Sequence, residues 1–154
     1  MNRKPTTPEG HAGIFQEYGD IPARYRLETY TQHYDGVDTL QRYYDEVYYP
    51  AHEPVSDWME EQIERVATSW KNHMADRNRH HALATPQDVD LWCQDLLEFC
   101  SPKTSYKSYF RRIYNFYNYL QDSHQHPHLY NPLLLAAIEY DATYRVWQYR
   151  VKLR

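Results

Sequence analysis

The feature that most constrains the fold is a helical spacing of apolar residues that runs from residue 57 almost to the end of the chain. Apolar side chains recur there at intervals of three and four residues, which places them on one face of an α-helix. No segment alternates apolar and polar residues as a half-buried strand does, and only four of the 154 residues are glycine. We therefore predict an all-α fold, with a bundle of four helices over about residues 57–150 in a helical domain that covers residues 56–154.

Capping residues set the expected ends of these helices. The first is predicted over residues 57–77, because Asp57 followed by Glu60 resembles a capping box. The later helices are each expected to begin at a capping residue followed by proline, at Thr85-Pro86, Ser101-Pro102 and Asn131-Pro132. We expect the third helix to cover residues 103–121 and the fourth to continue without a break to about residue 150. The residues expected in the core include Trp70, Trp92, Ile113, Phe116 and Leu120.

The first 55 residues are predicted to form an irregular arm. Proline and glycine interrupt residues 1–37 so often that no helical period survives. A short helix is expected near residues 39–49, ended by Pro50. Residues 50–55 then link the arm to the helical domain.

The charge is divided unevenly along the chain. The net charge of −4 consists of −9 over residues 1–100 and +5 over residues 101–154. A basic C-terminal third predicts a surface for an anionic partner, with nucleic acid as a candidate. No apolar run approaches the roughly 20 residues of a membrane span, and no secretory signal is recognisable. Cys93 and Cys100 lie about 10 Å apart on one predicted helix, too far for a disulfide, so we expect a reducing, cytoplasmic location.

The strongest candidate site is a basic row on the third predicted helix. Lys103, Lys107 and Arg111 follow one another at intervals of four and share one helix face, which Asn115 continues. Such a row suits DNA phosphates and base edges, although basic helix faces are more often simply solvated. Neighbouring candidates for DNA contact are Thr104, Ser108 and Arg112.

Other chemistry has weaker support in the sequence. Nine histidines include His124, His126 and His128, but their loop spacing does not suit zinc, so no metal or other cofactor is expected. No phosphate-binding loop or nucleophile elbow is present. The basic segment 150–154 is interpreted as either a frayed end or a phosphate contact.

Several motifs resemble the N-terminal core-binding, SAM-like domain of tyrosine recombinases, which include phage integrases and Xer-type enzymes. The resemblance covers residues 57–140 and depends on the order of short patterns. These are Ser69-Trp70, the start of the second helix with Trp92, Ser101-Pro102-Lys103-Thr104-Ser105-Tyr106, residues 112–120 and Asn131-Pro132.

The resemblance implies a SAM-like bundle of four or five short helices that binds duplex DNA through the start of its third helix, at Lys103, Thr104, Lys107 and Arg111. It also implies a catalytic recombinase subunit or a second protomer as a partner. The residues of the family's catalytic domain do not occur, since no histidine is followed three positions later by arginine. We therefore expect a module that binds DNA without cleaving it. The alternatives are an N-terminal fragment of a split integrase and a helical protein–protein adaptor.

Overall fold

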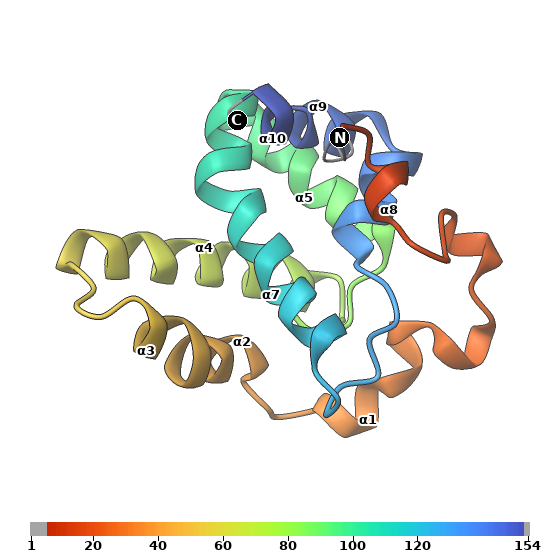
Figure 1. The fold of residues 1–154 in the computed structure, drawn as a ribbon, viewed down its shortest axis with the longest axis horizontal. Helices are drawn as coiled ribbons and strands as arrows, with labels where there is room; N and C mark the ends of the chain where they lie inside the picture. The colour runs from red at the N-terminus through yellow and green to blue at the C-terminus, as the bar shows by residue number, and fades with distance from the viewer. Residues whose placement is uncertain (1–5, 153–154) are drawn as a thin grey trace, which may run out of the picture.

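The computed structural model describes residues 6–152. All regular structure in this range is helical, and none of it is strand, which confirms the all-α class. In Figure 1 the long helix α7 (Arg111–Asp122) crosses the middle of the molecule. On one side of it lie α4 (Asp57–Asp76) and the arm helices α2 (Thr39–Tyr43) and α3 (Tyr49–Ala51).

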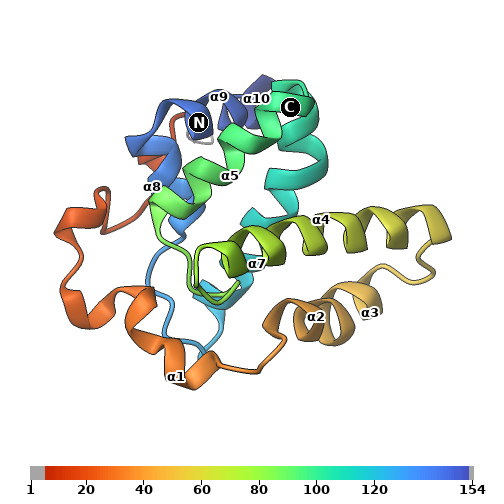
Figure 2. The same cartoon turned by 180° about the vertical axis from the view of Figure 1, so that it is seen from behind.

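On the other side, three helices pack closely on one another: α5 (Pro86–Phe99), α8 (Pro132–Glu139) and α9 (Asp141–Trp147). Figure 2, from behind, shows α5 and α9 at the same end of the molecule as α10 (Tyr149–Lys152). Before α7, the same continuous helix contains α6 (Pro102–Thr104) and the wider turns of η6 (Ser105–Phe110).

Three of the predicted capping sites are present. The Thr85 side chain accepts a hydrogen bond from the Asp88 backbone N–H, and the Asp88 carboxylate accepts one from the Thr85 N–H, which completes a capping box. Ser101 and Asn131 cap α6 and α8 in the same manner through their side chains. The cap of α4 differs from the prediction, because Ser56 rather than Asp57 accepts from the Met59 N–H.

Two predicted boundaries are wrong. The fourth helix does not continue to residue 150, because Tyr140 is extended at φ −131° and ψ 140° and separates α8 from α9. Pro50 does not end the short arm helix, which continues through the π-helical η5 (Tyr44–Tyr48) into α3. Pro50 lies in the last turn of this continuous helix, which ends one residue later at Ala51.

The core contains all five of the side chains predicted for it, each at most 1% exposed. Trp70 and Trp92 meet edge to face at 4.9 Å between ring centroids. Each indole N–H is satisfied, by the His81 carbonyl at 2.8 Å and the Ser69 hydroxyl at 3.1 Å respectively. The aromatic centre of the bundle is therefore both buried and hydrogen-bonded.

The arm packs against the bundle along much of its length. It consists of short turns: η1 (Glu9–His11), η2 (Tyr18–Asp20), η3 (Ala23–Tyr25), η4 (Leu27–Tyr30) and α1 (Thr31–Tyr34). Ile21 and Leu27 join the common core, and the Leu27 N–H donates to the Tyr130 hydroxyl at 2.8 Å. Within residues 6–152 no helix combines the length and apolarity needed to cross a bilayer.

Candidate nucleic-acid interface

The helix formed by α6, η6 and α7 has one fully buried face. Tyr106, Phe110, Ile113, Phe116 and Leu120 lie on it, and all are at most 6% exposed. The opposite face carries Lys103, Lys107, Arg111 and Asn115, and all four side chains are exposed. The basic row is therefore presented outward by a helix whose other side is anchored in the core.

The π-helical turns of η6 affect the direction of this row. In an α-helix of 3.6 residues per turn, side chains four apart drift steadily around the axis. The i→i+5 bonding of η6 places more residues in each turn and counteracts that drift between Lys103 and Arg111. We infer that the row runs nearly parallel to the helix axis.

No acidic side chain neutralises the row in the described structure. None of Lys103, Lys107 and Arg111 forms an ion pair within residues 6–152. Repulsion among three like charges at this spacing is therefore relieved only by solvent and by ions from outside the chain. An anionic partner would add attraction here and would displace no internal partner.

The remaining candidates differ in their surroundings. Thr104 is exposed, and its hydroxyl oxygen accepts from the Ser101 hydroxyl at 3.2 Å. Ser108 is half-buried. The Arg112 guanidinium donates to the Ser108 carbonyl at 2.7 Å and contacts the Met59 sulfur at 3.2 Å, so it ties η6 to α4. Arg112 is thus engaged inside the fold, whereas the other three cations of this helix point outward.

The C-terminal helices bring further positive charge to the same end of the molecule. Both α9 and α10 pack against η6, and Arg145 and Lys152 on them are exposed. The Arg150 guanidinium lies 5.0 Å from the centre of the Tyr114 ring. Within the basic segment 150–154, Arg150 is therefore seated on α7, and residues 153 and 154 lie outside the described residues. The sequence did not predict the contact between Arg150 and Tyr114, because the two residues are far apart in the chain and no local pattern relates them.

Tyr106 lies near two guanidinium groups, those of Arg111 and Arg150. Burial raises the pKa of its hydroxyl, although the charges of Arg150 and Arg111 act in the opposite direction. The side chain is 6% exposed. A buried phenol with a raised pKa is a poor nucleophile at neutral pH.

The histidines hold the arm to the bundle. His80 accepts from the Ala82 N–H at 3.0 Å and donates to the Val37 carbonyl at 2.7 Å, so its ring is neutral. Burial lowers the pKa of His81 to about 3 and that of His128 to about 4. No group of three or more histidine, cysteine, aspartate or glutamate side chains suited to a metal ion occurs among the described residues.

Comparisons with known proteins give no relative for this chain. No family model matches the sequence, and neither the curated proteins nor the solved structures contain a significant match.

Proposed function

We propose that this chain is a cytoplasmic DNA-binding module that contacts duplex DNA through Lys103, Lys107 and Arg111 and does not cleave it. The observation that carries the proposal is the exposed row of three cations, none of which forms an ion pair with a described residue. The major groove is about 12 Å wide and admits a helix, whose diameter with side chains is about 10–12 Å. Phosphate contacts would supply affinity and orientation, and contacts to base edges would supply specificity.

The roles of the neighbouring residues follow from their environments. Thr104 and Asn115 are exposed beside the row and suit hydrogen bonds to phosphates or base edges. Ser108 is half-buried and suits a contact only at the edge of the surface. The Arg112 guanidinium donates to the Ser108 carbonyl and stabilises the helix. We expect the other cations, and not Arg112, to contact phosphates.

The acidic part of the chain affects how DNA would be bound. Residues 1–100 carry a net charge of −9, which repels a duplex at long range. We therefore expect weak non-specific affinity and a need for a specific site, a second protomer or a catalytic recombinase subunit. The catalytic recombinase subunit is proposed only from the resemblance to recombinase core-binding domains.

The test is a titration of fluorescent duplex DNA with the purified chain at low salt. The double variant Lys107→Glu/Arg111→Glu should lose binding and keep its helical circular dichroism, because both residues are exposed. Arg65→Glu together with Arg24→Glu is the matched control, since both arginines are exposed and lie away from α6–α7. Equal affinity of the Lys107/Arg111 variant and the control pair would reject this surface.

A second candidate function is a protein–protein adaptor, favoured by a groove between the arm and α4. The groove encloses about 440 Å3 and is lined by Asp45, Glu60 and Glu64 together with Tyr44 and Tyr49. The pKa of Tyr49 is raised, mainly by burial and further by these three carboxylates. A basic peptide suits this groove, and its binding would be unaffected by Lys107→Glu/Arg111→Glu.

A further inference from the structure

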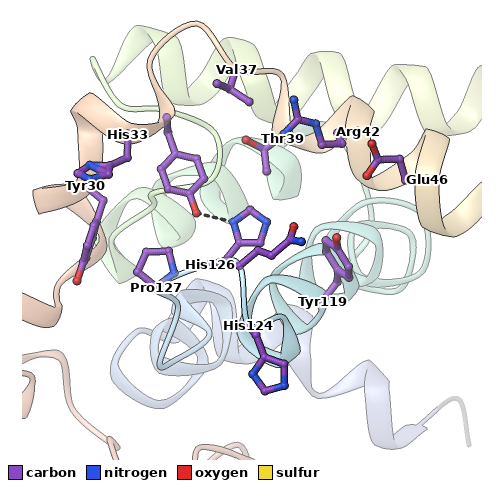
Figure 3. A pocket seen from close by; sticks show the side chains of 12 residues that line it. Tyr30, His33, Val37, Thr39, Arg42, Glu46, Tyr119, His124, His126 and Pro127 are labelled. Carbon is purple, nitrogen blue, oxygen red and sulfur yellow. Dashed lines mark hydrogen bonds between the residues drawn. The ribbon is translucent and has the colours of Figure 1, made fainter.

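A pocket of about 560 Å3 lies where the arm meets the end of α7, and neither DNA binding nor the adaptor role makes use of it. Its walls come from α1 and α2 on one side and from Tyr119 and the following loop on the other. The volume falls within the range of about 300–1,000 Å3 that is typical of small-molecule sites. Figure 3 shows Tyr30 at one end of the pocket, Arg42 and Tyr119 toward the other, and His126 between them.

One buried polar group in the pocket wall has no partner. The Thr39 side chain is 3% exposed, and its hydroxyl oxygen makes no hydrogen bond within the described structure. A buried hydroxyl without a partner costs about 1–3 kcal/mol, so such groups are rare in folded proteins. Figure 3 places Thr39 beside Arg42, on the side of the pocket that the arm supplies.

His126 supplies a second polar group, because the contact with Tyr34 occupies only one of its ring nitrogens. The Tyr34 hydroxyl lies 2.6 Å from Nδ1 of His126. Burial raises the pKa of Tyr34 to about 12, so this hydroxyl stays protonated at neutral pH. Burial and the charge of Arg42 lower the pKa of His126, so its ring is neutral. Nε2 makes no hydrogen bond with any of residues 6–152 and is open to a ligand.

Arg42 adds a full positive charge to the pocket wall. It is exposed on α2 and forms no ion pair with a described residue, including Glu46 one turn further along. A guanidinium beside an imidazole nitrogen without a protein partner favours a ligand group that carries negative charge and can form hydrogen bonds with both.

The other end of the pocket favours an aromatic group. The Tyr30 hydroxyl donates to the Arg24 carbonyl at 3.2 Å, which holds the ring in place from behind. Tyr34 and Pro127 also line the pocket. A planar ring stacking on Tyr30 would leave the rest of the ligand to extend past His126 toward Arg42.

We propose that this pocket binds a small ligand that joins a planar aromatic ring to an anionic group, of the size and chemistry of a nucleoside monophosphate. The anionic group lies between the Arg42 guanidinium and Nε2 of His126, and the ring lies against Tyr30. Glu46 stands on the rim beyond Arg42 and weakens the binding of an anion through repulsion. The site is separate from the basic row, which lies toward the other end of the same long helix.

The experiment is an NMR titration of the 15N-labelled full chain with adenosine 5′-monophosphate. We expect saturable shifts at the amides of residues 30–42 and 119–127. Adenosine and inorganic phosphate, each carrying half of the recognised chemistry, should bind at least about tenfold more weakly. Shifts concentrated at residues 103–111, or no saturable shift, would overturn the proposal, as would equal affinity for phosphate alone.

Variants separate this site from the DNA surface. Arg42→Gln should weaken binding about tenfold or more, and Glu46→Gln should strengthen it. Thr39→Val removes an unpaired hydroxyl that is closed to the pocket, so it should leave binding unchanged and keep the unfolding midpoint equal to or above that of the original chain. Arg65→Gln and Lys107→Glu should leave the affinity unchanged, so DNA binding can fail without affecting this result. Unchanged affinity in Arg42→Gln would reject the site.

Discussion

The carboxylate of Asp90 on α5 caps the first turn of α9, where Thr143 donates to it from its backbone N–H at 2.9 Å and from its hydroxyl at 2.8 Å. Tyr140, which precedes α9, provides no side-chain cap of its own. Asp90 is 5% exposed, so the two hydrogen bonds are shielded from water. One buried carboxylate therefore both starts α9 and fixes it against α5, beside the basic helix.

We predict that Asp90→Ala lowers the free energy of unfolding by about 1–3 kcal/mol, because it removes a helix cap and leaves buried donors unpaired. Urea denaturation followed by circular dichroism measures the change. Asp95→Ala is the matched control on the same helix, since this side chain is 67% exposed, and it should change stability by less than about 0.5 kcal/mol. Equal effects of the two substitutions would contradict the capping role.

The sequence predicted those features of the fold that depend on interactions between residues close together in the chain. The caps at Thr85 and Asn131 depend on residues two or three positions away, and the apolar spacing of α5 and α7 depends on one helix face. The break at Tyr140 was not predictable in this way, because the cap that starts α9 comes from Asp90, fifty-three positions earlier.

The candidate sites likewise contain some features that the sequence predicted and others that it did not. The basic row was predicted from its spacing alone, and the structure places its members on one exposed face. The inward engagement of Arg112 and the seat of Arg150 on Tyr114 involve residues far apart in the chain. The pocket beside Thr39 lies between the arm and the loop after α7. No periodic pattern in the arm predicted the burial of Leu27 or Tyr34.

Trp92 provides a test of the core. It is 1% exposed and packs edge to face on Trp70, so Trp92→Ala should lower the free energy of unfolding by about 3–5 kcal/mol. Trp58→Ala is the control, because that side chain is 64% exposed and should contribute less than about 0.5 kcal/mol. Chemical denaturation of both variants measures the difference, and a small effect at Trp92 would show that the two indoles do not form the centre of the core.

The neutral histidines predict a loss of stability in acid. The folded chain holds the pKa of His128 at about 4, below the 6.5 of an unperturbed histidine, so the unfolded chain takes up a proton first as the pH falls. The free energy of unfolding should therefore begin to fall near pH 6.5 and continue to fall to about pH 4, with no contribution from this group at higher pH. His81 acts in the same direction, and Asp38 beside it, whose pKa is lowered, adds to the loss at still lower pH.

Denaturation midpoints measured from pH 8 to pH 4 test this expectation. His128→Gln keeps a donor for the Ala82 carbonyl and removes the titrating group, so the decline should become shallower. His124→Gln is the control at an exposed position and should follow the original curve. An unchanged slope in His128→Gln would show that the acid sensitivity arises elsewhere.

Tyr106 predicts the outcome of a test for DNA cleavage. Its hydroxyl is buried and its pKa is raised, so it cannot attack a phosphate even though Arg111 and Arg150 lie near it. Incubation with a nicked duplex that traps covalent intermediates should give no protein–DNA adduct on a denaturing gel. Recovery of an adduct that disappears in Tyr106→Phe would contradict the proposed non-catalytic role.

The salt dependence of DNA binding counts the phosphate contacts made by the basic row. Each neutralised phosphate contributes a slope of about −0.9 to the logarithm of the binding constant against the logarithm of salt concentration. Contacts from Lys103, Lys107 and Arg111 therefore predict a slope of roughly −3, measured by fluorescence anisotropy between 50 and 200 mM salt. Lys107→Gln should reduce the magnitude of the slope by about one. Arg65→Gln is the control, because it removes the same charge from α4 and should leave the slope unchanged. If Lys107→Gln does not alter the slope, the phosphate contacts lie on another surface.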